Sequence, residues 1–322
     1  MKKMTIILSA VLAVQLLLAG ILFSQDQDMG AFRSREKLLG LELAKLDQIS
    51  IESKDKKINL KKVQGKWILP KHFNAPVDDN KLRKLTDKLF SLPVSWPVAT
   101  SENSASRFKV TKEQFEREIS FAKGDDILKT LFLGSSPGFK KIHARVDGQN
   151  TIYSIDFAAY EAPVNVDDWV DKHLLTIDVD SLSKVTTDKF SLTRNGDIWQ
   201  VENLEEGKVA NQEKIQTWLG KLAKLQYNGI LGTQAKPEYG LEKPVVSFKL
   251  TLKSGDQIDI TIGKMANDYV IKSSHQPFYF KASQYQIQAI LDTGVDTFSV
   301  PKPVEKDRGE SQSQKKSKEK TE

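Results

Sequence analysis

A serine motif is the first feature of this sequence that could do chemistry. Residues 134–138 read Gly-Ser-Ser-Pro-Gly and satisfy the G-x-S-x-G pattern of a hydrolase nucleophile elbow, with Ser136 as the nucleophile. That elbow uses the backbone N–H of the next residue in its oxyanion hole, and here the next residue is Pro137, which has none. A later strand-ending glycine, Gly263, has no serine motif after it. We therefore interpret residues 134–138 as a turn at the end of a strand.

The residue types that bind metals are scattered. No two histidines have the spacing that would place two ligands on one face of a helix. The sequence has no cysteine, which excludes disulfides, thiolate ligands and a cysteine nucleophile. We expect no metal, no cofactor and no catalytic residue. The four histidines are His72, His143, His173 and His275.

Three acidic pairs could suggest acid/base chemistry. Asp125-Asp126 follows Gly124 between two strand-like runs and is typical of a turn, since neighbouring strand residues point to opposite faces. Asp78-Asp79 precedes a helical pattern, where a carboxylate caps free N–H groups. We interpret Asp167-Asp168, before Trp169, in the same way.

Nucleotide and nucleic-acid binding are not indicated. The chain has no G-x-x-x-x-G-K-[ST] and no G-x-G-x-x-G pattern, so it is not the nucleotide-hydrolysing subunit of a transporter. The formal net charge of +6 comes partly from Lys2, Lys3 and the 301–322 segment, which leaves +2 for the remainder. A nucleic-acid surface would need lysines and arginines clustered on one face. We expect a protein that is not an enzyme and has no nucleic-acid partner.

The N-terminus indicates the compartment. Residues 4–23 are free of charge and span about 30 Å as a helix, which is the thickness of a bilayer core. Lys2 and Lys3 precede the run, so the positive-inside rule places the rest of the chain across the membrane. A cleaved signal peptide is the alternative, but leucines occupy the −3 position of its possible cleavage sites. We predict a transmembrane signal-anchor at 1–23 in the inner membrane, a polar stalk at 24–40, and the bulk of the chain in the periplasm.

The chain repeats its pattern at a nearly constant offset. Ile58, Leu60 and Trp67 correspond to Phe190, Leu192 and Trp199 at an offset of 132. Apolar residues at helical 3, 4, 3 spacing follow in both halves, at an offset of 133. Because Trp67 and Trp199 stand at equivalent places, we interpret both as core residues rather than as a binding platform. The helical residues are Leu82, Leu85, Leu89 and Leu92 in the first half, and Ile215, Trp218, Leu222 and Leu225 in the second.

Strand patterns complete each half. The runs 248–252 and 258–262 alternate apolar and polar residues, and Gly255-Asp256 between them is a hairpin turn signal. We predict an α+β fold of two tandem homologous repeats, each an antiparallel sheet with one amphipathic helix packed on it. Each repeat is expected to have two or three strands, a helix and four more strands. The predicted repeats cover residues 41–175 and 176–292, and residues 293–322 are expected to form a disordered polar tail, because the end of the chain is poor in apolar residues.

Two local patterns carry a family resemblance. The segment around Trp169, Asp-Trp-Val-Asp-Lys-His-Leu-Leu at 168–175, leads from the first half into the second, and Tyr239-Gly240-Leu241 precedes Pro244. With the paired tryptophan hairpins, they make residues 41–292 resemble the family called domain of unknown function 4340, in two tandem copies. Members of that family are often encoded beside ABC-type transporters. The resemblance implies a periplasm-facing accessory subunit and offers no catalytic residue, while Phe108-Lys109-Val110 departs from the Tyr-Gly-Leu pattern.

Two functions remain open from the sequence. The first is a membrane-anchored, non-enzymatic accessory protein whose partners are membrane-protein subunits of an ABC-type transport or envelope complex. The second is a periplasmic binding module for a small ligand or cell-wall polymer in the groove between the repeats, since ligands often bind between domains. Co-purification with membrane subunits would favour the first, and a ligand that raises the melting temperature would favour the second.

Overall fold

The computed structural model describes residues 36–302, together with Leu12 and Gln15. The chain divides into two compact units, unit 1 up to Asp171 and unit 2 from Lys172. Within the described residues, no helix is both long enough and apolar enough to cross a bilayer. The predicted anchor at 1–23 lies outside the described residues except for Leu12 and Gln15, and the end of the chain after Lys302 also lies outside them.

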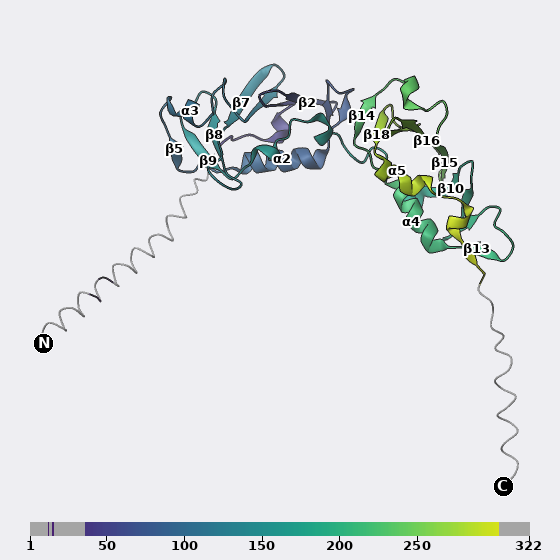
Figure 1. Ribbon diagram of the computed structural model, residues 1–322. Coiled ribbons are helices and arrows are strands. Elements are labelled where there is room, and N and C mark those ends of the chain that lie inside the picture. Colours follow the sequence, from purple (N-terminus) through teal and green to yellow (C-terminus); the bar gives the residue numbers. More distant parts are fainter. Residues whose placement is uncertain (1–11, 13–14, 16–35, 303–322) are drawn as a thin grey trace, which may run out of the picture. The chain divides into compact units, whose positions relative to one another are not determined.

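Between residues 36 and 171, unit 1 contains strands, two α-helices and short 3₁₀ turns (Figure 1). In chain order they are η1 (Leu43–Lys45), β1 (Gln48–Glu52), β2 (Lys57–Val63), β3 (Lys66–Leu69), β4 (Ala75–Pro76), α2 (Asp79–Ser91), β5 (Pro97–Ala99), α3 (Ser104–Arg107), β6 (Arg117–Lys123), β7 (Asp126–Leu133), β8 (Ile142–Val146), β9 (Ile152–Ile155), η2 (Ala159–Glu161) and η3 (Val166–Asp168).

The strands of unit 1 form one antiparallel sheet, in the order β4-β3-β2-β1-β6-β7-β8-β9-β5. Helix α2 packs on this sheet through Leu82, Leu85, Thr86, Leu89 and Phe90. The ring of Phe90 meets that of Phe121 in β6 edge to face, with centroids 5.2 Å apart. The leucine spacing therefore predicted the buried face of this helix, and Leu92 just after it is buried as well.

Unit 2 contains the same kinds of elements. They are η4 (Val179–Ser181), β10 (Leu182–Thr186), β11 (Ser191–Asn195), β12 (Ile198–Val201), β13 (Lys208–Ala210), α4 (Gln212–Ala223), β14 (Gly229–Gly232), η5 (Pro237–Tyr239), β15 (Val246–Leu252), β16 (Gln257–Met265), β17 (Asp268–Ser273), β18 (Tyr279–Ala282), α5 (Gln284–Leu291), η6 (Val295–Phe298) and β19 (Ser299–Pro301).

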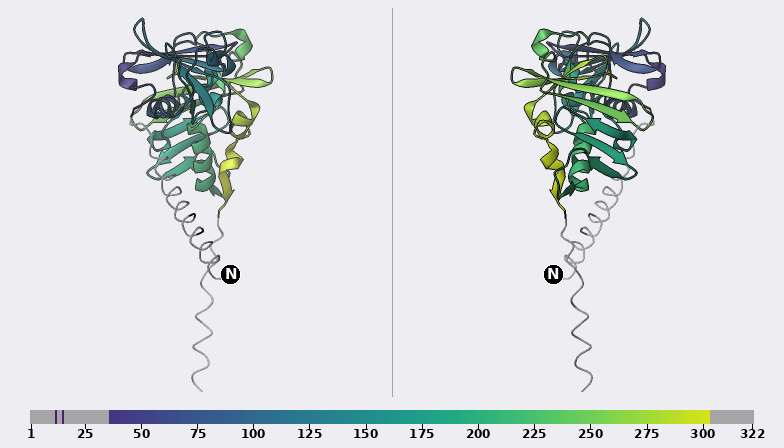
Figure 2. Two further views of the ribbon diagram at one scale, coloured as in Figure 1. Left: turned by 90° about the vertical axis from the view of Figure 1, so that its left-hand side faces the viewer. Right: turned by 90° about the vertical axis from the view of Figure 1, so that its right-hand side faces the viewer.

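The main sheet of unit 2 is antiparallel with the order β12-β11-β10-β15-β16-β17-β18-β14, and β13 pairs separately with β19. Helix α4 packs through Trp218, whose indole lies near the rings of Phe190, Phe248 and Phe298. Helix α5 lies beside α4 (Figures 1 and 2). The core of this unit thus lies between the sheet and this pair of helices.

The two sheets share one plan. If β4 is left out, each strand of the unit 1 sheet has a counterpart at the same place in the unit 2 sheet. The two sheets end in β5 and β14 on one side and in β3 and β12 on the other. Each unit has four strands before the long helix, where two or three were predicted, and five main-sheet strands after it, where four were predicted; unit 2 also has β19. The extra strands, β5 and β14, have three and four residues, too few for a period-2 pattern to appear.

Two predicted boundaries differ from the structure. Residues 36–40, expected in the stalk, pack on unit 1: Leu38 and Leu39 are buried, and the Leu38 N–H donates to the carbonyl of Leu92. Residues 293–302, expected in the disordered tail, belong to unit 2, where Phe298 is fully buried. In both cases a few apolar residues near the end of a polar stretch supply enough burial to order the backbone.

Candidate functional site

The paired tryptophans occupy equivalent places in their hairpins. Trp67 in β3 stands opposite Lys62, and Trp199 in β12 stands opposite Arg194. Both indoles are buried, and Trp199 is fully so. The Arg194 guanidinium lies 6.0 Å from the centre of the Trp199 ring. The prediction that both are core residues is confirmed.

Trp169 packs near the end of unit 1 and contacts the start of α2. Its Nε1 donates to the carbonyl of Pro163 at 2.8 Å, and its own carbonyl accepts from the Asp78 N–H. Val170 bridges to Val77, next to β4. The segment is therefore part of the unit 1 fold, which accounts for a buried aromatic residue at this position.

At the Tyr239-Gly240-Leu241 pattern, the backbone of a turn lies very close to the backbone of β16. Gly240 has a φ of +65° and caps η5, while Tyr239 is buried and Leu241 half-buried. A Cβ on Gly263, in β16, would lie 2.2 Å from the Tyr239 carbonyl oxygen. Only glycine allows β16 to pass so near this turn.

Unit 1 makes the same approach with different residues. Lys109 stands where unit 2 has Gly240 and keeps the left-handed backbone, with a φ of +55°. A Cβ on Gly134 would lie 2.0 Å from the Phe108 carbonyl oxygen. Unit 1 thus has Phe-Lys-Val where unit 2 has Tyr-Gly-Leu, but the backbone arrangement is the same in both units.

The serine motif is a turn, as predicted. The Ser136 hydroxyl is within hydrogen-bond distance of the carbonyls of Gly138 and Lys141, at 2.8 and 2.7 Å. Its neighbour Ser135 has its Oγ 3.0 Å from Nδ1 of His143, which the sequence analysis did not connect. The Ser135 Oγ also lies 3.2 Å from the carbonyl of Phe108, and the His143 Nδ1 lies 2.8 Å from the carbonyl of Ser135. These contacts hold the turn at Ser135 against Phe108 and His143.

The other candidate polar residues do not converge. No group of three or more His, Asp or Glu side chains that could hold a metal occurs among the described residues. Asp78 caps α2 as predicted, accepting from Asn80 and Lys81, and Asp125 lies in the β6–β7 turn. The capping interpretation of Asp167-Asp168 is wrong, because both lie inside η3. The cap of η3 is Asn165, whose side chain makes no capping bond.

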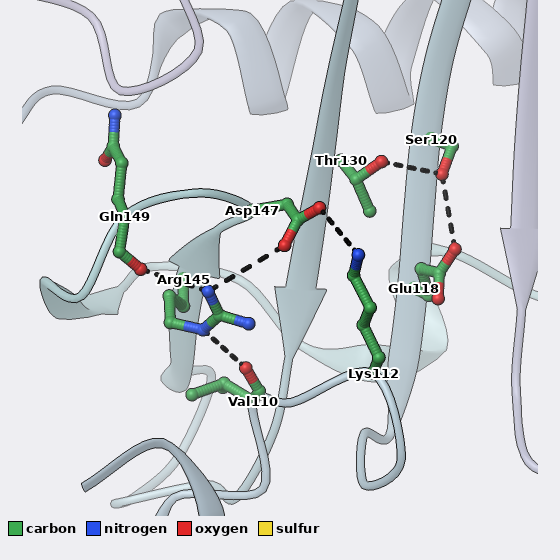
Figure 3. Close-up of polar contacts among 8 residues, drawn as sticks. All are labelled: Val110, Lys112, Glu118, Ser120, Thr130, Arg145, Asp147 and Gln149. Carbon is green, nitrogen blue, oxygen red and sulfur yellow. Dashed lines mark hydrogen bonds and ion pairs between the residues drawn. The ribbon is translucent and has the colours of Figure 1, made fainter. Parts of the chain in front are cut away.

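A second polar cluster lies at the end of β8, beside the loop between α3 and β6 (Figure 3). Arg145 donates from Nε to the carbonyl of Val110 at 2.6 Å and from Nη1 to that of Gln149 at 3.0 Å. Asp147 lies between Arg145 and Lys112, at 4.0 and 3.5 Å. Because the guanidinium already holds two loops and stacks 5.1 Å from the Phe132 ring centre, we interpret this cluster as structural.

A cavity with a volume of about 660 Å³ lies beside α2. Three of its lysines come from one face of the helix at 3 and 4 spacing, and a fourth comes from the β7–β8 loop. The lining carries these four cations against two carboxylates. The lysines are Lys81, Lys84, Lys88 and Lys140, and the carboxylates are Glu161 and Asp168.

The corresponding helix of unit 2 has a smaller cavity of about 340 Å³ beside it. Lys214 and Lys221 stand at the helix positions of Lys81 and Lys88, whereas Thr217 stands at that of Lys84. Asp292 and Glu213 also line this cavity. The lysine-rich lining is therefore a property of unit 1.

An exposed apolar edge is the other feature of unit 1. Trp96 is 74% exposed and Val98 43% exposed, at the start of the edge strand β5. The counterpart in unit 2, β14, is largely buried. No pattern in the sequence distinguishes Trp96 from the other tryptophans of the chain.

The comparisons with known proteins give one result. No curated protein and no solved structure matches this chain. A family model described as "Domain of unknown function (DUF4340)" matches residues 67–244. The match is one stretch that runs from β3 in unit 1 to the residues before β15 in unit 2, so it identifies the family without dividing the chain into two copies. Since it covers more than half of the 322 residues, the chain belongs to the DUF4340 family.

Proposed function

We propose that this protein is a membrane-anchored, periplasm-facing, non-enzymatic accessory protein of an ABC-type transport or envelope complex. The observation that carries the proposal is where the chain enters unit 1. The Leu38 N–H donates to Leu92 and the Val94 N–H donates to Glu36, so the entering segment runs beside residues 92–94. Trp96 follows only two residues later. The exposed apolar edge therefore lies next to the connection to the proposed anchor.

The length of that connection supports a partner in the membrane. Residues 24–35 separate the apolar run from the first docked residue. A linker of twelve residues is short, since flexible linkers of that length have an end-to-end distance of roughly 20 Å. Tethering over that distance gives an effective concentration toward a membrane partner of about millimolar, so a weak contact suffices.

The chemistry of the edge favours side-chain contacts over strand addition. Pro97 begins β5 and has no N–H to offer a new neighbouring strand. Exposed Trp96 and Val98 supply apolar area, and tryptophan is enriched in interface hot spots. We propose that an apolar periplasmic segment of a membrane-protein subunit covers these two side chains.

We further propose that the two units are tandem homologous copies. Their strand orders correspond, and the paired tryptophans hold the same hairpin position. Gly134 and Gly263 make the same close approach to an equivalent turn. We propose that the edge at β5 in unit 1 stays exposed to bind the partner, whereas the equivalent edge at β14 in unit 2 is buried.

A fusion experiment tests the location. Alkaline phosphatase joined after residue 322 should be active, because that enzyme folds only outside the cytoplasm, and the fusion should stay in the membrane fraction after a salt wash. A matched fusion with residues 1–23 deleted should be inactive. Activity of the deleted form, or release of the intact form by salt, would contradict the proposal.

A further inference from the structure

We propose that the cavity beside α2 in unit 1 binds a small ligand with a phosphate or carboxylate group attached to a flat apolar part. Its volume of about 660 Å³ falls in the range of small-molecule sites. The site goes beyond the proposed accessory role, since it lies on unit 1 alone and needs no membrane partner.

The charges of the cavity favour an anion. Lys88 is paired with Glu161, whose carboxylate also accepts from the Ala158 N–H. Lys81 is 4.0 Å from Asp168, at the limit of an ion pair. Within the described residues, no carboxylate forms an ion pair with Lys84 or Lys140, so no ion pair offsets their charges in the cavity.

The helix itself also favours an anionic ligand. Lys81, Lys84 and Lys88 lie on successive turns of one face, and like charges at this spacing repel each other. A phosphate or carboxylate near Lys84 would offset the repulsion between these lysines. Two lysine ammonium groups from different elements, Lys84 and Lys140, can then approach the same oxyanion from α2 and from the β7–β8 loop.

An apolar wall defines the rest of the ligand. Phe157 is buried and lines the cavity, as do Leu85 and Pro163. Tyr160 lines the same cavity with 67% of its surface exposed, which leaves its ring available for stacking. The oxyanion group would meet the lysines while a ring or other flat part lies against these side chains.

Unit 2 supplies the internal comparison. Its helix retains cations at the outer two positions, Lys214 and Lys221, but has Thr217 in the middle. The Lys84→Thr substitution gives α2 the residue that α4 carries at this position. Lys221→Thr removes one positive charge from the equivalent helix and is the matched control.

The test is a titration of the full-length protein in neutral detergent with phenyl phosphate, followed by calorimetry. We expect Lys84→Thr to weaken binding about tenfold, Lys221→Thr to leave it unchanged, and added salt to weaken it in the wild type. Tyr160→Ala should weaken phenyl phosphate more than inorganic phosphate. Melting temperatures of all variants provide the check that each is folded.

Two further probes identify the source of the oxyanion. Binding of glycerophosphoglycerol, the headgroup of an anionic lipid, would assign a phosphodiester, whereas preference for benzoate would assign a carboxylate. Benzyl alcohol, which has the ring without the charge, should not bind. The proposal is overturned if no anionic probe binds, or if Lys84→Thr and Lys221→Thr weaken binding equally.

Discussion

Gly134 and Gly263 show how single residues determine this fold. Gly134 directly follows β7 and Gly263 lies in β16, and each passes within contact distance of a turn backbone, Phe108-Lys109 in unit 1 and Tyr239-Gly240 in unit 2. The space beside each glycine is occupied by main-chain atoms, which cannot rotate away as a side chain can. Neither has the left-handed backbone that usually explains a glycine, so the only sequence signal at these positions is the end of a strand pattern.

Alanine substitutions test this account. Gly134→Ala and Gly263→Ala should each destabilise their unit by about 1–3 kcal/mol or more, because a methyl group would overlap carbonyl oxygens. Gly220→Ala is the control, since it lies inside α4 with open space around its Cβ position. It should stabilise unit 2 by about 0.5–1 kcal/mol through helix propensity. Urea unfolding gives all three values, and equal effects at the three sites would contradict the account.

The sequence predicts which side chains are buried better than it predicts which side chains contact each other. Trp67 and Trp199 are core residues as predicted, because an apolar ring in an alternating strand has one buried face to occupy. The Ser135–His143 contact was missed, since it depends on how a turn folds back over eight residues. The α2 cavity was missed for a similar reason: lysines on a helix normally read as a solvated face, and the loops that enclose them have no periodic pattern.

At the scale of elements, the long helix and the long strands were predictable and the short ones were not. The leucine spacing identified α2, and Gly255-Asp256 identified the β15–β16 turn, with a φ of +92° at Gly255. Strand β19 was missed because only three residues form it, at the start of a charged stretch. It is held by pairing with β13 rather than by its own pattern.

A charge pair beside β13 and β19 should make this part of unit 2 sensitive to pH. Lys208 donates to Asp296 at 2.8 Å, which lowers the pKa of Asp296 below its ordinary value of 3.8. Hydrogen bonds from Lys208 to Asp296 and Glu205 raise the pKa of Lys208 to about 12. The pair therefore contributes fully between pH 3.8 and 10.5, loses its contribution as pH falls below 3.8, and loses it again as pH rises toward 12.

Hydrogen exchange measures this effect. The Val300 amide of β19 and its neighbours should exchange faster relative to the core of unit 2 when the pH falls below 3.8. Asp296→Asn should show the faster exchange already at neutral pH and little further change in acid. Asp296 is exposed and Lys208 is half-buried, so the global stability should change little. Protection of β19 that is independent of pH in the wild type would contradict the role of the pair.

At the scale of the whole molecule, the sequence predicted the α+β class, antiparallel sheets with packed helices and the family. The division at Asp171 and Lys172 falls close to the predicted boundary between residues 175 and 176. The ends were less predictable, because Leu38, Leu39 and Phe298 are buried by distant elements. The exposed edge at Trp96 appears only in the folded chain, since exposure depends on what the sheet leaves uncovered.

The measurement that tests the account most directly is site-specific photocrosslinking in cells from position 98, beside Trp96. The control probe replaces Ile127, which is 68% exposed in β7 of the same unit, away from the proposed contact. The account predicts discrete crosslinks to membrane-protein subunits from position 98 and none from position 127. It also predicts that these crosslinks disappear when residues 1–23 are replaced by a cleavable signal peptide. Identical crosslinks from both positions, or undiminished crosslinks and full function in the released form, would contradict the proposed membrane-tethered role.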